Sequence, residues 1–434
     1  MVRQIPPLDS RSVALDLLDA VLVRKRLLDV AMVEHGGFSH LQERDRAFVR
    51  LLVATVLRRL GQVDSLLSRC LDRKLPSKAG RVQDVLRIGA VQLLFLNTPP
   101  HAAIATAVDL VKNSPLAGFA KLVNAVLRRL DREGHDWLKN QDEARLNTPD
   151  WLWQSWCDSY GETTARAIAQ AHLRETPLDI TVASDAQGWA ERLEAVLTPT
   201  GSLRRPAGGD VTALPGFDQG VWWVQDMAAA LPARLLGDVR GKRVADLCAA
   251  PGGKALQLAA AGATVTAIDR SAKRLQRFQQ NLRRLGLHAE IVEADVAAWR
   301  PAAPFDAVLL DAPCTATGTL RRHPDGLRLK GPGDVAALAD QQTALLRAAT
   351  EMVKPGGILV YCVCSLEPQE GAAQVERLLA NDSRLARHPI RAEEVGGLAQ
   401  LISAQGDLRT LPCHLAESGG MDGFFAARLR RRPD

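Results

Sequence analysis

Two cysteines near the carboxyl ends of predicted strands are the residues of this chain best suited to covalent chemistry. Cys314 closes the block Asp311–Cys314, and Cys364 lies in the block Tyr361–Ser365. In an open α/β sheet, the carboxyl edge of the strands is where ligands bind and side chains meet substrate. A thiolate at that edge, beside a nucleotide-like cofactor, suggests covalent attack on an electrophilic ring.

A glycine-rich turn earlier in the chain predicts a cofactor site. The block Asp246–Lys254 reads Asp-Leu-Cys-Ala-Ala-Pro-Gly-Gly-Lys and joins a predicted strand to a predicted helix. Glycine lets the backbone pass close to a ligand, and a helix N-terminus offers free N–H groups. The spacing is not G-x-G-x-x-G, which disfavours a dinucleotide. Asp269 closes the next strand, where an acid typically holds ribose hydroxyls, and Asp295 closes the third strand region and places another carboxylate at the same edge.

The flanking sequence predicts the elements that position these residues. Residues 221–434 alternate short apolar runs with helical stretches, which predicts a doubly wound, mostly parallel α/β sheet of the Rossmann-like class. The last of these runs is expected to pair antiparallel with its neighbour. The predicted strands are Val244–Leu247, Val265–Ile268, Ile291–Val292, Ala307–Leu310, Ile358–Val363 and Gly423–Leu429.

The preceding residues predict two further parts. Residues 10–130 carry apolar residues at helical spacing, with Ser10 as a candidate N-cap, and predict an all-α bundle. Residues 147–220 mix a strand at Leu178–Val182, a helix at Trp189–Leu197 and glycine turns, which predicts a small α+β module. The chain is therefore predicted to be multidomain, with a bundle over 1–140, a linking module over 147–220 and the α/β domain over 221–434.

Composition limits the class of protein. The 434 residues carry a formal net charge of +6, which is compatible with a polyanionic partner. The apolar runs are shorter than a membrane span of about 20 residues, and the N-terminus has no apolar segment of the signal-peptide type. Seven scattered cysteines suit a reducing compartment, and none has zinc-ligand spacing. We expect a cytoplasmic monomer that binds no membrane and no metal.

The motifs together resemble a known family. The blocks Asp246–Lys254, Asp311–Gly318 and Tyr361–Ser365 resemble those of the RNA 5-methylcytosine methyltransferases. Thr319–Asp325 and Asp422–Phe425 are similar to the Sun/Fmu (RsmB/NOP) family of bacterial 16S rRNA (cytosine-5) methyltransferases. The helical bundle is similar to the NusB RNA-binding domain. The resemblance implies a class I methyltransferase fold, S-adenosyl-L-methionine as cofactor and 16S rRNA as partner, either naked or in a partly assembled small subunit.

The resemblance also implies roles for individual residues. Cys364 would be the nucleophile, Cys314 would assist breakdown of the adduct, and Asp311 and Lys254 would act on the target base. The bundle and the basic residues around Arg321 would contact RNA phosphates. The residues implied to hold the cofactor are Cys248, Ala249, Ala250, Pro251, Gly252, Gly253, Lys254, Asp269, Asp295 and Asp311.

The chain departs from the family pattern at two places. Val363 stands where relatives often have threonine, and Cys362 adds a thiol that could share a strand face with Cys364, although we expect it to be a core residue. Pro177–Val182 lacks the arginine and asparagine that relatives commonly carry near this strand, which leaves RNA contacts from the middle module in doubt.

Three other functions remain open from the sequence. A tRNA cytosine-5 methyltransferase would share the catalytic domain and differ in substrate. A non-catalytic RNA-binding or antitermination-type assembly factor would keep the fold without the chemistry. A DNA cytosine methyltransferase would attack with Cys314 instead of Cys364, so the presence of both cysteines favours the RNA enzymes.

Overall fold

The computed structural model describes residues 9–76 and 79–433, which form two compact units. The first unit contains the residues up to Leu173 together with Arg322–Lys330. The second contains Arg174–Arg321 and the chain from Gly331 onward. This division assigns the helical half of the 147–220 segment to the first unit and its strands to the second. The functional division into three parts stays a prediction.

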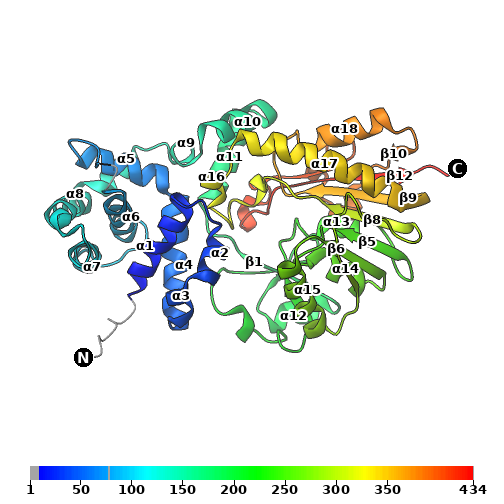
Figure 1. Cartoon of the computed structure of the whole chain (residues 1–434), viewed down its shortest axis with the longest axis horizontal. Coiled ribbons are helices and arrows are strands. Elements are labelled where there is room, and N and C mark those ends of the chain that lie inside the picture. Colours follow the sequence, from blue (N-terminus) through cyan, green and yellow to red (C-terminus); the bar gives the residue numbers. More distant parts are fainter. Residues whose placement is uncertain (1–8, 77–78, 434) are drawn as a thin grey trace. The chain divides into compact units, whose positions relative to one another are not determined.

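The first unit is all helical (Figure 1). Residues 326–329 add a short helix to it from much later in the chain. Its α-helices are α1 (Ser10–Leu22), α2 (Leu28–Glu34), α3 (Gly36–His40), α4 (Glu43–Arg58), α5 (Leu60–Cys70), α6 (Gly80–Leu94), α7 (Pro100–Lys112), α8 (Ala120–Lys139), α9 (Glu143–Asn147), α10 (Asp150–Tyr160), α11 (Glu162–His172) and α16 (Gly326–Leu329).

Amphipathic spacing explains these helices. In α1, Leu17, Leu18 and Val21 recur at helical spacing and are fully buried in the core of the bundle. The N-cap is Asp9, whose side chain accepts the backbone N–H of Arg11 at 3.2 Å, so the cap lies one residue before the expected Ser10. Burial of each such leucine contributes about 1.5–3 kcal/mol, which makes packing the main source of helix stability.

The large sheet of the second unit has the strand order β10-β12-β9-β8-β5-β6-β7, with β11 paired to β12. Strands β5 to β9 are parallel, and β12 is antiparallel to β9, as the sequence predicts. The strands are β5 (Arg243–Leu247), β6 (Thr264–Asp269), β7 (Glu290–Glu293), β8 (Phe305–Asp311), β9 (Val353–Val363), β10 (Leu385–Arg387), β11 (Leu408–Thr410) and β12 (Phe424–Arg431).

Helices cover both faces of this sheet (Figure 1). Alternate strand residues define the two faces, so that Leu309 and Val360 pack on one side and Leu310 and Tyr361 on the other. One cluster holds α13 (Leu231–Arg234), α14 (Gly253–Ala260) and α15 (Ala272–Leu285). The other holds α17 (Pro332–Met352) and α18 (Ala372–Asn381). The predicted doubly wound fold is confirmed.

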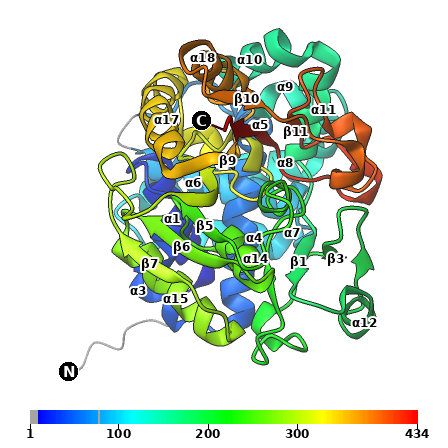
Figure 2. The same cartoon turned by 90° about the vertical axis from the view of Figure 1, so that its right-hand side faces the viewer.

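A small antiparallel sheet precedes the large one and belongs to the same unit (Figure 2). Its order is β2-β3-β1-β4, and Trp222, Trp189 and Ile180 form its buried core. The helix expected over Trp189–Leu197 ends at Arg192, and the chain then forms a short strand. Its elements are β1 (Leu178–Val182), α12 (Ala186–Arg192), β2 (Val196–Leu197), β3 (Leu203–Arg205) and β4 (Trp222–Val224).

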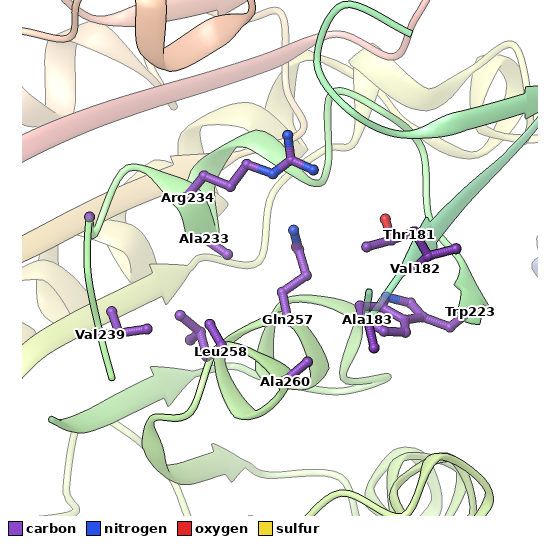
Figure 3. A pocket seen from close by; sticks show the side chains of 12 residues that line it. Thr181, Val182, Ala183, Trp223, Ala233, Arg234, Val239, Gln257, Leu258 and Ala260 are labelled. Carbon is purple, nitrogen blue, oxygen red and sulfur yellow. The ribbon is translucent and has the colours of Figure 1, made fainter. Parts of the chain in front are cut away.

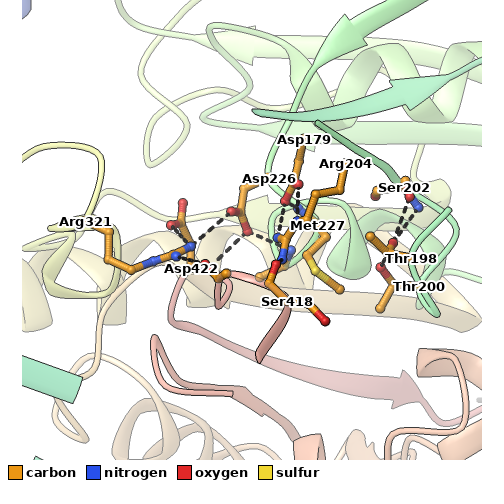
Figure 4. Close-up of polar contacts among 12 residues, drawn as sticks. Asp179, Thr198, Thr200, Ser202, Arg204, Asp226, Met227, Arg321, Ser418 and Asp422 are labelled. Atoms are coloured by element: carbon orange, nitrogen blue, oxygen red, sulfur yellow. Dashed lines mark hydrogen bonds and ion pairs between the residues drawn. The ribbon is translucent and has the colours of Figure 1, made fainter. Parts of the chain in front are cut away.

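Buried ion pairs join this small sheet to later segments of the unit (Figure 4). Arg204 of β3 donates to both carboxylate oxygens of Asp179 at 2.7 and 2.8 Å and to the carbonyl of Ser418 at 2.8 Å. Asp179 also accepts the backbone N–H of Met227 at 3.0 Å. An arginine therefore does reach β1, from the neighbouring strand rather than from Pro177–Val182 itself.

Arg321 lies in the same network, which overturns one expectation. Its side chain is 1% exposed, lies 3.7 Å from Asp226 and 3.4 Å from Asp422, and donates to the carbonyl of Gly419 at 2.7 Å. A guanidinium enclosed in this way cannot contact an RNA phosphate. The prediction that Arg321 itself supplies a phosphate contact is wrong, because its own guanidinium faces acids rather than solvent, whereas the next two residues of the run, Arg322 and His323, are half-buried and exposed.

Two features are absent from residues 9–76 and 79–433. No helix within these ranges is long and apolar enough to cross a membrane. No group of three or more histidine, cysteine or acidic side chains there could hold a metal ion, and the absence of a metal stays a prediction. All seven cysteines of the sequence are free thiols.

The Arg204–Asp179 pair gives a test of this arrangement. Arg204→Met leaves the fully buried carboxylate of Asp179 without its cation, so we expect the free energy of unfolding to fall by about 3–5 kcal/mol. Urea denaturation measures the change. Arg205→Met, at the next and partly exposed position of β3, is the matched control and should cost less than about 1 kcal/mol. Equal losses in both variants would contradict the assigned role.

Candidate active site

Neighbouring parallel strands bring the two predicted cysteines together. The register of β8 and β9 sets Asp311 opposite Cys362, so the turns that follow these strands leave the same edge of the sheet. Cys314 and Cys364 lie in those turns, and their sulfur atoms are 3.4 Å apart. Both side chains are partly exposed. Both thiols lie at the carboxyl edge of the sheet, where the sequence places them, whereas the chemical role of each thiol is a separate question.

Lys254 and Asp311 form the second contact of the site. The ammonium of Lys254 donates to Asp311 Oδ2 at 2.7 Å and lies 5.0 Å from the centre of the Phe424 ring. The thiol of Cys362 donates to Asp311 Oδ1 at 3.5 Å. Cys362 is fully buried in the core, as expected, but it also contacts an active-site carboxylate.

The glycine turn has the close approach that a cofactor loop requires. Gly252 has a φ of +105°, and a Cβ added there would lie 1.9 Å from Phe278 of α15. Helix α14 begins directly afterwards, and Gly252 provides no side-chain cap for its first N–H groups. Cys248 packs under the turn, and burial followed by the charge of Asp269 raises the pKa of its thiol to about 12.

Asp269 and Asp295 lie where two further strands leave the sheet. Asp269 is 2% exposed and accepts the backbone N–H groups of Ala250 at 3.1 Å and Ser271 at 2.9 Å. It therefore fixes the glycine turn. Strand β7 ends at Glu293, so Asp295 lies beyond it, exposed, and accepts the N–H of Ala297 at 3.0 Å.

Burial and charge determine which groups keep their protons. The contact with Cys364, followed by burial, raises the pKa of Cys314 well above its ordinary value. Burial and then the charge of Asp311 raise the pKa of Cys362 well above its ordinary value. Burial disfavours the ammonium of Lys254, but the charge of Asp311 and its hydrogen bond, together with the charges of Cys362 and Asp246, outweigh burial and raise the pKa of Lys254. Cys314 thus keeps its proton and can donate it to the sulfur of Cys364.

Three residues that sequence reasoning did not single out support the cysteine turns. Glu370 accepts hydrogen bonds from both turns, Gln342 donates to the carbonyl of Pro313 at 2.9 Å, and Arg409 donates to the carbonyl of Ser365 at 2.7 Å. The one sequence signal for Glu370 was an acidic residue six positions after Cys364. Nothing in the spacing of Gln342 or Arg409 marks them.

A hollow of about 300 Å³ elsewhere in the second unit is lined by none of the predicted site residues (Figure 3). Thr181, Trp223, Arg234 and Gln257 contribute side chains to it. Ala260 and Ala261, at the far end of α14 from the glycine turn, also line it. The hollow therefore lies at the amino edge of the sheet, away from the edge where Lys254 and Asp311 meet.

Comparisons with known proteins agree with this geometry. A family model described as 16S rRNA methyltransferase RsmB/F matches residues 233–430, and one described as NusB family matches residues 8–132. Ribosomal RNA small subunit methyltransferase B of Shewanella oneidensis is 34% identical over 96% of this chain and 98% of its own length. A probable ribosomal RNA small subunit methyltransferase B of Synechocystis is 32% identical over 98% of this chain and all of its own.

Solved structures share the fold. The crystal structure of PH0851 matches with a TM-score of 0.75 and 20% identity, over 98% of this chain and 99% of that one. A methyltransferase homolog protein from Pyrococcus horikoshii matches with a TM-score of 0.54 and 27% identity, over 64% of this chain and 93% of its own. The first match extends the similarity of fold to nearly the whole chain.

Asp246 gives a pH-dependent test of the site. Burial, reinforced by the charge of Asp311, raises the pKa of this carboxyl from 3.8 to about 8. A pKa raised by folding means that stability is present at low pH and is lost as pH rises between these two values. Asp246→Asn removes this pH dependence of stability. The free energy of unfolding of the variant, relative to that of the wild type, should therefore rise by about 1.4 kcal/mol per pH unit between pH 5 and pH 8.

The control for this test is Asp306→Asn. A hydrogen bond from Lys354 lowers the pKa of Asp306, so its contribution to stability is complete above pH 5 and is lost only in stronger acid. The difference between this variant and the wild type should therefore stay constant from pH 5 to pH 8 in urea titrations. A constant difference for Asp246→Asn as well would refute the buried neutral carboxyl.

Proposed function

Because this chain belongs to the RsmB/F family of 16S rRNA methyltransferases, we propose that it methylates carbon 5 of a cytosine in small-subunit rRNA through a covalent cysteine adduct. Membership of this family is the evidence for rRNA methylation. The single observation that supports the covalent route is the 3.4 Å contact between the sulfur atoms of Cys314 and Cys364 beside the Lys254–Asp311 pair. Bacterial rRNA is made in the cytoplasm, where the enzyme acts as a monomer.

The glycine turn and the strand-end acids fit S-adenosyl-L-methionine. The uncapped start of α14 would receive the methionine end, Asp269 would hold the ribose, and Asp295 would bind near the adenine. When bound, this cofactor supplies a methyl group as a sulfonium electrophile, which carbon 5 of the cytosine takes.

Cys364 begins the reaction by attacking the cytosine ring. Its thiolate forms a carbon–sulfur bond at carbon 6, and the electron pair of the ring double bond moves toward carbon 5, which becomes nucleophilic. Asp311 takes up a proton as the base binds and donates it in a hydrogen bond to the ring nitrogen, which favours the negative charge that develops there. Lys254 holds Asp311 through their 2.7 Å contact. Since a cytosine within a helix cannot be reached, the target base is unpaired or flipped.

Cys314 completes the reaction. After methylation carbon 5 bears both the new methyl group and a hydrogen, and a water that Cys314 positions takes this hydrogen as a proton and passes it to solvent. The bond between carbon 6 and Cys364 then breaks, the ring double bond re-forms, and Cys364 leaves as a thiolate. The raised pKa of Cys314 supports this assignment, because the protonated partner is not the initial nucleophile.

The two cysteines predict opposite failures. Cys364→Ala should lose turnover on the order of 10³-fold or more while binding S-adenosyl-L-methionine normally, since only the nucleophile is removed. Cys314→Ala should accumulate a covalent protein–RNA complex that survives denaturing electrophoresis. The matched control is Cys413→Ala, a thiol in neither turn, which should leave turnover unchanged. If Cys314→Ala gave inert, uncrosslinked protein, Cys314 would be the nucleophile, as in DNA cytosine methyltransferases.

The substrate is tested by tritium transfer from labelled S-adenosyl-L-methionine. We expect label in small-subunit rRNA as 5-methylcytosine after nuclease digestion, and none in bulk tRNA. Deproteinised rRNA and partly assembled small subunits are offered separately to establish which form is methylated. Label confined to tRNA would keep the mechanism and reject the substrate. Cofactor binding without label in any RNA would favour a non-catalytic assembly factor.

A further inference from the structure

One buried carboxylate connects the turns that carry the two cysteines. Glu370 is fully buried in the turn before α18. Its Oε1 accepts the backbone N–H of Thr315 at 2.9 Å, and its Oε2 accepts the hydroxyl of Ser365 at 2.6 Å and the hydroxyl of Thr315. Thr315 directly follows Cys314, and Ser365 directly follows Cys364. A single side chain therefore holds the residue next to each active-site thiol.

Further hydrogen bonds make this connection rigid. The amide of Gln342 in α17 donates to Glu370 Oε1 at 3.1 Å and also to the carbonyl of Pro313 at 2.9 Å. The hydroxyl of Tyr361 on β9 donates to the backbone carbonyl of Glu370. Strand β9, helix α17 and the start of α18 thus all contribute to the network, and all belong to the second unit.

The donors around Glu370 require an acceptor with no proton of its own. Two hydroxyls, one backbone N–H and one amide N–H point at its two oxygens. A carboxylate can accept all four, because each oxygen has two lone pairs. An amide of the same shape would present N–H groups to some of these donors and leave buried groups unpaired, at a cost of about 1–3 kcal/mol each.

The charge of Glu370 acts unequally on the two thiols. After the contact with Cys364 and burial, Glu370 is among the charges that raise the pKa of Cys314. Its hydrogen bonds fix both turns, whereas its charge favours the protonated form of Cys314. The two effects can be separated by experiment, since one alters geometry and the other alters a titration.

We propose that Glu370 is a positioning residue for methyl transfer, holding the turns of Cys314 and Cys364 so that both thiols face the same base. This role rests on the proposed covalent mechanism and deepens it. Glu370 contacts neither the base nor the cofactor and acts through Thr315 and Ser365. Loss of the carboxylate should therefore slow formation of the adduct and its breakdown together, which neither cysteine variant does.

Glu370→Gln tests the proposal in the full-length enzyme. We expect kcat to fall between about 10-fold and 100-fold with KM for RNA and cofactor nearly unchanged, since misplaced reacting groups cost this much. Adduct formation on rRNA containing 5-fluorocytosine, which traps the covalent complex, should slow by the same factor. Thr315→Val, which removes one hydroxyl, should show a smaller loss of the same kind and serves if Glu370→Gln does not fold.

A thiol titration separates positioning from a purely structural role. The pH profile for alkylation of Cys314 by iodoacetamide should shift to lower pH in Glu370→Gln, because a negative charge is removed. Glu394→Gln is the matched control, since Glu394 accepts from Arg428 and from the N–H of Arg391 away from both cysteine turns. It should leave kcat and the Cys314 profile unchanged.

The outcomes distinguish this inference from the proposed function. Wild-type enzyme that forms no trapped adduct rejects the covalent mechanism itself, whatever Glu370→Gln does. Active wild type, with Glu370→Gln retaining kcat and the wild-type Cys314 profile, overturns the positioning role alone. A fall in kcat that Glu394→Gln reproduces, without any shift in the Cys314 profile, also overturns it, because general destabilisation then explains the loss.

Discussion

The parallel pairing of β8 with β9 is the constraint on which the candidate active site depends. Its register sets Asp311 opposite Cys362, and the two turns that follow bring the cysteine sulfurs to 3.4 Å. A slip of one residue would reverse the direction of every side chain on one strand. Both strands are buried on both faces, so packing of Leu309 and Leu310 against opposite helix layers holds the register. The apolar core therefore fixes the positions of the two cysteines.

The charged groups at this edge are better explained by chemistry than by stability. Burying an ion costs several kcal/mol even after relaxation, and an apolar replacement of a buried pair is often neutral or stabilising. The site nevertheless encloses Lys254 with Asp311 and sets Asp246 close enough for their charges to interact. Burial raises the pKa of Asp246 to about 8, which favours its neutral form, so Asp311 is the main carboxylate partner of Lys254. The other oxygen of Asp311, Oδ1, accepts the hydrogen bond from the thiol of Cys362.

Local sequence predicted the strands and the motif residues because their signals are local. Apolar runs such as Ala307–Leu310 lie inside the observed strands, and the blocks that carry Cys314 and Cys364 contain the last residues of β8 and β9. The errors came from partners distant in sequence. Arg321 looked solvent-exposed because Asp422, its acid, lies 101 residues later. Glu370 gave no strong signal because its importance comes from donors on two other loops.

The segment Arg322–Lys330 shows why unit boundaries were beyond sequence reasoning. Its chain neighbours belong to the second unit, yet Asp325 accepts the backbone N–H of Leu28 at 3.0 Å within the first. Arg321, one residue before the crossing, is held in the second unit by its acids. A segment fixed at both ends has already lost most of its conformational entropy. The unit to which Arg322–Lys330 belongs is therefore set by contacts with residues distant in the chain, which the local sequence does not show.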